Sequence, residues 1–84
     1  NEWTGTAFCT RRRQWASERG TVVLCEWDRG QFVMFLHPAG GGEHRRCTVQ
    51  RPGELESGLA RLGVSMPASV RAEMMLFMNE GRQG

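Results

Sequence analysis

The sequence predicts a small single-domain α+β fold, an antiparallel three-stranded β-meander with two C-terminal helices and an N-terminal helix. Two observations support this prediction. Between residues 21 and 50 apolar side chains alternate with a period of two, and after residue 52 the period is near 3.6. With 84 residues the chain is too short for two stable cores, so we expect one compact domain over residues 1–84, frayed at residues 1–5 and 81–84.

The composition is that of an ordinary soluble globular protein. Hydrophobic residues make up 39% of the chain and charged residues 24%, and no apolar run reaches the ~18–20 residues that span a membrane. The three cysteines are odd in number and widely spaced, which indicates reduced thiols and not a secreted disulfide scaffold. We therefore expect a cytoplasmic protein without membrane contacts.

All eleven basic residues are arginine, and the chain contains no Lys, Ile or Tyr. This joint bias fits a GC-rich coding sequence of bacterial type, so the abundance of arginine by itself says little about function. The net charge of +2 is also small for a dedicated nucleic-acid-binding protein.

The N-terminal segment fits either a helix or a strand. A helix over residues 6–19, ending at Gly20, would place four side chains on one face: Phe8, Arg12, Trp15 and Arg19. A strand over residues 4–10, with an arginine-rich turn behind it, fits the same segment. Ala7, Ala16 and the arginines between them are good helix formers, so we predict the helix.

A β-hairpin is the most clearly marked element. Two runs rich in β-branched and aromatic residues, 21–27 and 31–37, are joined by a short link that contains Asp28 and Gly30. Gly30 supplies the positive φ angle that such a turn requires. Alternation assigns the side chains to two faces: Val23, Cys25, Trp27, Val33 and Phe35 on one, and Val22, Leu24, Phe32, Met34 and Leu36 on the other.

Both faces of this hairpin are apolar, whereas a ribbon with one face in water alternates apolar with polar residues. The hairpin therefore needs cover on both sides, from helices, from another sheet or from a second copy of the chain. This requirement is the most informative feature of the sequence.

A third strand is predicted over residues 44–50, after a loop that contains Pro38 and three consecutive glycines. Its apolar residues alternate only weakly with charged ones. This pattern is typical of an edge strand that is protected against edge-to-edge aggregation.

The chain then forms a short helix that begins near Pro52 and ends at Gly63. Its inward face carries three leucines at helical spacing: Leu55, Leu59 and Leu62. Gly58 in the middle costs roughly 1 kcal/mol relative to Ala, so this helix needs packing partners to persist.

A second helix runs from an N-cap at Ser65 to about Glu80, where Gly81 is expected to end it. Met75 and Leu76 widen its apolar surface beyond the inward stripe, which consists of Val70, Met74, Phe77 and Met78.

The stretch Leu59–Ser65 resembles the turn of bacterial helix-turn-helix regulators. In such a motif the following helix reads DNA through polar side chains, whereas here it presents Met74, Met75 and Phe77, with Arg71 as its only basic residue. The resemblance therefore implies a helical hairpin and not a DNA reader.

The second helix and the hairpin together carry more apolar surface than a chain of this length can bury, so we expect a contiguous exposed patch. Such a patch marks a protein interface. The leading hypothesis is a small non-enzymatic binding module, with an accessory, regulatory or inhibitory role, that binds a protein partner or forms a homodimer. The residues expected at the interface are Met74, Met75, Phe77, Met78, Phe32 and Met34.

An alternative hypothesis is a nucleic-acid-associated regulator. The arginines form two dense groups, which would share one surface if the N-terminal segment lay beside the third strand. The residues expected to bind a phosphate backbone are Arg11, Arg12, Arg13, Arg45 and Arg46. The competing interpretation is a solvated face enriched in arginine by codon bias.

The sequence gives little support for metal or nucleophile chemistry. His37, His44 and Cys47 are ligand types that suit zinc, but only His44 and Cys47 have the close spacing of a structural zinc site. Cys25 lies in an apolar strand, where burial keeps a thiol unreactive. We expect no cofactor, no small-molecule substrate and no enzymatic activity, and any role of Cys9, Cys25 or Cys47 stays open.

Overall fold

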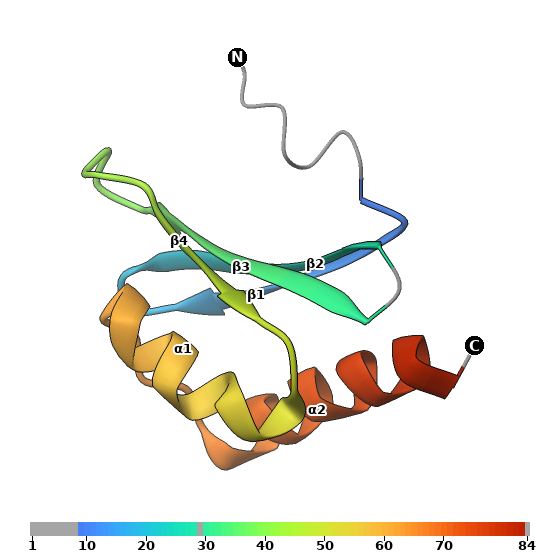
Figure 1. Cartoon of the computed structure of the whole chain (residues 1–84). Coiled ribbons are helices and arrows are strands. Elements are labelled where there is room, and N and C mark those ends of the chain that lie inside the picture. The colour runs from blue at the N-terminus through green and yellow to red at the C-terminus, as the bar shows by residue number, and fades with distance from the viewer. Residues whose placement is uncertain (1–8, 29, 84) are drawn as a thin grey trace.

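A computed structural model describes residues 9–28 and 30–83 and shows a two-layer α+β domain (Figure 1). One layer is a four-stranded antiparallel sheet in which the strands follow one another in chain order. Two helices form the other layer, and both lie against the same face of the sheet (Figure 1). The elements are β1 (Arg11–Ser17), β2 (Gly20–Asp28), β3 (Gln31–Pro38), β4 (Arg45–Val49), a 3-10 turn η2 (Pro52–Glu54), α1 (Leu55–Leu62) and α2 (Ala68–Gln83).

The predicted hairpin is confirmed as β2 and β3, which pair in the expected antiparallel register. Gly30 in the turn has a φ of 68°. The two predicted faces are also separate: the helices cover Val22, Leu24, Phe32, Met34 and Leu36, and a second buried cluster on the other face consists of Val23, Cys25, Val33 and Phe35.

The third predicted strand is confirmed as β4, which pairs with β3 and forms one edge of the sheet. It is one residue shorter at each end than predicted, because the ladder stops at the pairs Leu36–Arg45 and Phe32–Val49.

The predicted N-terminal helix is wrong: residues 11–17 form β1, which pairs with β2 and raises the number of strands from three to four. Trp15 is buried toward the helices, while its neighbours Gln14 and Ala16 are exposed, as in any half-buried strand. Pairing along the whole edge of β2 outweighs helix propensities that differ by less than about 1 kcal/mol per residue. Residues 6–8 of the predicted helix lie outside the described residues.

Gly20 fixes the tight turn between β1 and β2. Its φ is 142°, and a Cβ atom at this position would lie 2.1 Å from the carbonyl oxygen of His37. A hydrogen bond from the N–H of Ala39 to the carbonyl of Arg19, at 3.0 Å, holds the residue before Gly20 against the end of β3. Only glycine fits here, since any side chain would meet the backbone of β3.

Both predicted helices are confirmed. Gly63 ends α1 in the left-handed conformation, with a φ of 77°, and its N–H donates to the carbonyl of Ala60. The first helical bond of α2 runs from the N–H of Arg71 to the carbonyl of Pro67, so Pro67 and not Ser65 occupies the N-cap position. The helix continues past the predicted stop at Gly81 to Gln83, because one glycine in a helix costs only about 1 kcal/mol.

The main core fills the space between the sheet and the two helices. The predicted inward stripe of α2 lies in it, with Met74, Phe77 and Met78 buried and Val70 half-buried. The rings of Phe32 and Phe77 meet edge to face, with their centroids 6.1 Å apart. Among the described residues, neither helix is both long and apolar enough to cross a membrane.

Gly58 marks the closest approach of α1 to the sheet. A Cβ atom there would lie 2.9 Å from Cγ2 of Val49 and 3.1 Å from Cε of Met34. The thiol of Cys47 donates to the Gly58 carbonyl at 3.4 Å. The close contact with the sheet offsets the conformational cost of a glycine inside a helix.

Candidate functional site

The predicted protein interface lies mostly in the core. Five of the six residues expected there are buried between the helices and the sheet: Met74, Phe77, Met78, Phe32 and Met34. These side chains hold the domain together, and the folded chain does not present them to a partner. Only Met75 lies at the surface, with 38% of the residue exposed.

Two other large apolar residues are exposed in the described part of the chain, Leu76 at 62% and Trp27 at 45%. Met75 and Leu76 are neighbours on the outer side of α2, and such a small exposed pair is ordinary for a soluble domain. Trp27 lies at a register shift between Glu26 and Asp28, which is a bulge near the end of the hairpin. Bulges redirect side chains, so Trp27 departs from the regular alternation that the sequence predicted.

The strand order separates the two groups of arginines. β1 and β4 are opposite edges of the sheet, so the condition under which the two groups would share one surface, an N-terminal segment beside the third predicted strand, is not met. Alternation then divides each group between the two faces. Arg12 pairs with Cys25 and Arg46 with Phe35, so both stand on the face without helices. The residues on the helix side are Arg11, Arg13 and Arg45.

Arg11 and Arg13 are bound within the domain. Arg11 donates to Oε1 of Glu26 at 2.7 Å and to the carbonyl of Phe77 at 2.6 Å, and its guanidinium lies 4.0 Å from the centroid of the Phe77 ring. Arg13 donates to the carboxylate of Glu73 at 2.9 Å. The bond to Glu26 joins β1 to β2, and the bonds to Phe77 and Glu73 join β1 to α2, so both arginines have structural roles.

Arg45 reaches toward the helices as well. Its Nη1 atom lies 3.3 Å from the position that a Cβ atom of Gly63 would take, and Nη1 of Arg19 lies 3.4 Å from the same point. Arg45 and Arg19 therefore flank the end of α1 and do not share a surface with Arg12.

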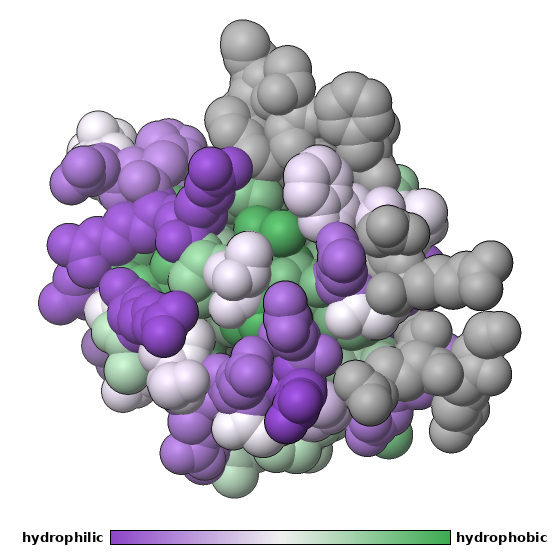
Figure 2. Space-filling view, viewed as in Figure 1, coloured by the Kyte–Doolittle hydropathy of each residue, from purple (hydrophilic) through white to green (hydrophobic). Residues whose placement is uncertain are grey.

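The helix-free face of the sheet carries cations that lack an acidic partner among the described residues. Arg12 on β1 and Arg46 on β4 are both exposed, and neither belongs to an ion pair of the described chain. The ion pairs of that part of the chain lie on the helix side: Arg11–Glu26, Arg11–Glu80, Arg13–Glu73 and Arg71–Glu56. Hydrophilic side chains also gather over β4 and the loop before it, around apolar surface (Figure 2).

Between Arg12 and Arg46 runs an apolar strip, which consists of Val23, Cys25, Val33 and Phe35. The half-buried Cys9 packs against this strip, and its thiol contacts that of Cys25. Burial, and after it the hydrogen bond with the Cys9 thiol, raises the pKa of Cys25 from its ordinary value of 9.0 to about 12. Cys25 therefore stays protonated at neutral pH.

The structure brings together two of the three weak candidates for metal ligands, His37 and His44. The Nδ1 atoms of His37 and His44 lie 2.9 Å apart at the end of the helix-free face, and the ring of His37 stacks against Phe35. Cys47 pairs with Met34 and packs on the helix side, where burial raises the pKa of its thiol. No group of three or more His, Cys, Asp or Glu side chains in the described residues is arranged to hold a metal ion.

A pocket of about 410 Å³ opens beside the histidine pair, where β3 and β4 separate. It is lined by Phe35, Leu36, His37, His44, Arg45 and Arg46, and so contains no carboxylate. Since the guanidinium of Arg45 reaches toward Gly63, the polar groups available to a ligand are Arg46 and the two imidazoles.

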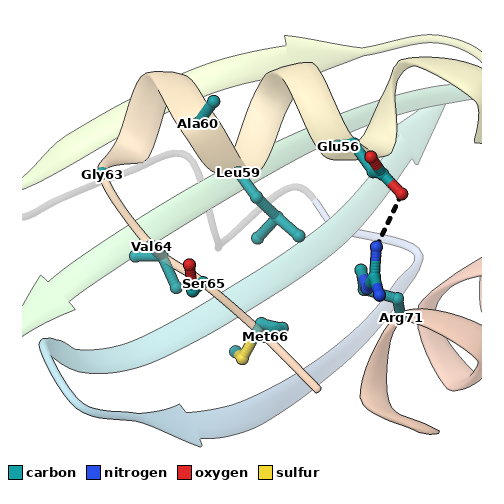
Figure 3. A pocket seen from close by; sticks show the side chains of 8 residues that line it. All are labelled: Glu56, Leu59, Ala60, Gly63, Val64, Ser65, Met66 and Arg71. Carbon is teal, nitrogen blue, oxygen red and sulfur yellow. Dashed lines mark hydrogen bonds and ion pairs between the residues drawn. The ribbon is translucent and has the colours of Figure 1, made fainter. Parts of the chain in front are cut away.

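A second pocket, of about 470 Å³, lies on the helix side where α1 turns into the segment before α2 (Figure 3). Arg71 closes one end of it with a 2.6 Å bond to the Glu56 carboxylate, and Leu59 forms part of its wall (Figure 3). The Nε atom of Arg71 is buried without a hydrogen-bond acceptor. We interpret Arg71 as a link between α1 and α2, because its bonded partner comes from the other helix.

The arrangement of this site differs from the prediction because consecutive arginines of one strand point to opposite faces and do not act as one group. The period-two alternation from Arg11 to Ala16, with Trp15 in phase with Arg11 and Arg13, is the signal that would have assigned them to opposite faces. No protein-family model, curated protein or solved structure matches the chain.

Proposed function

We propose that this chain is a non-enzymatic binding module that holds single-stranded nucleic acid across the helix-free face of its sheet. The observation that carries the proposal is the placement of two exposed arginines, Arg12 and Arg46, at opposite edges of the helix-free face. On the helix side, carboxylates neutralise Arg11, Arg13 and Arg71. On the other face Arg12 and Arg46 have no ion-pair partner among the described residues, so a polyanion is drawn to this face.

The shape of the face favours a single strand over a duplex. Neighbouring strands lie about 4.8 Å apart, which separates the backbones that carry Arg12 and Arg46 by roughly 14 Å. The four side chains of the apolar strip between them are almost fully buried, so the half-buried ring of His37 is the group on which an unstacked base can pack while the backbone meets the arginines. The helices, which would be needed to enter a duplex groove, lie on the opposite face (Figure 1).

The proposal is tested by fluorescence anisotropy with a labelled oligothymidylate of about 15 nucleotides, a length that covers one such site. We expect binding at low salt that weakens about sevenfold as salt rises from about 50 to about 200 mM, as roughly two phosphate contacts require. Arg12→Ala and Arg46→Ala each weaken binding and reduce this salt dependence. The matched control is Arg61→Ala, an exposed arginine on α1, which leaves the affinity unchanged. Absence of binding at low salt contradicts the proposal.

Self-association through the same face is a second candidate function. The exposure of Trp27 near the end of the hairpin favours it, because tryptophan is enriched among the residues that dominate protein interfaces. Light scattering coupled to size exclusion, over a range of protein concentrations, tests it. A mass that rises to that of a dimer in the unmodified chain but not in Trp27→Ser supports a second copy as the partner, and a constant monomer mass contradicts it.

A further inference from the structure

We propose that the pocket between the ends of β3 and β4 binds the terminal phosphate of the nucleic-acid strand through Arg46 and the His37–His44 pair. The inference rests on the proposed function. It adds that the bound strand ends in a phosphate monoester, a group that the helix-free face alone would not distinguish.

The position of the pocket suits the end of a strand that lies across the sheet. Leu36 and Arg45 form the last pair of the β3–β4 ladder. The pocket of about 410 Å³ lies at this end of the ladder, and its volume is room for about one nucleotide. Phe35, which belongs to the apolar strip, also lines the pocket, so the face continues into it.

The histidine pair supplies a hydrogen-bond donor even when both rings are neutral. In the Nδ1···Nδ1 contact of 2.9 Å one ring donates its Nδ1–H and the other accepts it. The accepting neutral ring must then carry its own proton on Nε2, where it can donate to a ligand. A bound dianion also favours protonation of the other ring, because an adjacent negative charge stabilises an imidazolium.

The charges in the pocket match a monoester better than an internal diester. A terminal phosphate carries about −1.5 to −2 at neutral pH, whereas each diester carries about −1. Arg46 presents a planar fork that binds two phosphate oxygens at once, and the imidazole donor can take the third. None of the residues that line the pocket is acidic, so nothing in the lining opposes an anion.

The first experiment compares oligothymidylates of equal length that end in a 5′-phosphate, a 3′-phosphate or hydroxyl groups alone. We expect one phosphorylated oligonucleotide to bind about fivefold more tightly, or better, than the hydroxyl form. Arg46→Gln and His44→Ala abolish this preference. Arg12→Ala, at the other edge of the sheet, weakens all three oligonucleotides by the same factor and keeps the preference.

The second experiment follows the histidine ring signals by NMR during titration with thymidine monophosphate, and with thymidine as the control. Shifts of the His37 and His44 signals with the monophosphate alone support the pocket. If the oligonucleotides bind without any preference for a terminal phosphate, the inference is overturned and the proposed function stands. If no oligonucleotide binds, the proposed function fails. The titration with thymidine monophosphate then tests separately whether the pocket binds a phosphate monoester, and unchanged histidine signals mean that it does not.

Discussion

The Nδ1 atoms of His37 and His44 lie 2.9 Å apart, and the two rings meet edge to face with centroids separated by 4.9 Å. Because a bond between two ring nitrogens needs one donor and one acceptor, this contact exists only while at least one imidazole is neutral. It joins the end of β3 to the residue before β4, across the loop of residues 39–43. The contact makes this end of the sheet sensitive to pH.

We predict that the domain loses stability as the pH falls below about 6.5. Burial, and then the positive charges of His44 and Arg12, lower the pKa of His37 below its ordinary value of 6.5. The unfolded chain therefore takes up this proton at a higher pH than the folded chain does. The contribution of neutral His37 to the free energy of unfolding is complete above pH 6.5. It is lost as the pH falls through that value toward the lowered pKa of His37 in the folded state.

Urea denaturation of the unmodified chain and of His37→Gln, between about pH 7.5 and pH 5, measures this effect. The variant lacks the part of the pH dependence that belongs to His37, while carboxylate titration affects both proteins equally. A His37 ring signal that titrates at or above pH 6.5 in the folded protein would disprove the prediction.

Arg11→Ala should destabilise the domain, whereas Arg12→Ala, one residue along, should not. Loss of Arg11 removes the charged donor to the buried carboxylate of Glu26, which keeps only the 3.3 Å bond from the N–H of Gly30, and the guanidinium donor to the carbonyl of Phe77. The expected cost is about 2 kcal/mol, below that of a fully buried pair because the Arg11 side chain is 31% exposed. Chemical denaturation measures both variants, and equal stabilities would refute the division of the arginines between two faces.

Gly20→Ala should prevent folding or cost at least about 3 kcal/mol, because the new Cβ would collide with the backbone of β3 and the left-handed φ disfavours any side chain. Gly40→Ala is the matched control, since a Cβ there has open space around it and the backbone needs no positive φ. Circular dichroism and thermal melting distinguish the two. A normal melting curve for Gly20→Ala would mean that the β1–β2 turn differs from the one described.

Cys25 should resist alkylation in the folded chain. Raising the pKa of its thiol from 9.0 to about 12 lowers the reactive thiolate about a thousandfold at pH 8. We expect iodoacetamide to modify Cys25 at that pH only after the chain is unfolded in urea, as mass spectrometry of peptides can follow. Equal rates in the folded and unfolded chains would contradict the burial of this thiol.

The hairpin, the edge strand β4 and both helices could be predicted from the sequence because each has a strong local pattern. Gly30 and Gly63 adopt the positive φ angles that their turns predict, and the leucines of α1 repeat at helical spacing on its buried face. Where a local pattern was weak the prediction failed. Three of the seven residues of β1 are arginines, which are good helix formers. Its strand conformation depends on pairing with β2, which the local sequence of β1 does not indicate.

The candidate site could be predicted only in part, because it depends on which faces the helices cover. The sequence indicates that both sides of the hairpin need cover. In the structure both helices pack on one side, where they bury Phe32 and Met34. The His37–His44 contact joins residues seven apart in the chain, and the spacing rules for metal ligands favour His44 with Cys47 instead. Because side chains alternate along β4, Cys47 lies on the helix side of the sheet, away from the two histidines.

The bond from Arg11 to the carbonyl of Phe77 spans 66 positions of the chain, from the first strand of the sheet to the last helix. During synthesis the successive hairpins can pair as they emerge, because each contacts only its neighbour. Trp15 and Phe32, however, stay exposed until α2 has been synthesised and packs over them. A nascent or prematurely terminated chain that stops before Phe77 therefore leaves these apolar side chains exposed, in a form that chaperones and proteases recognise.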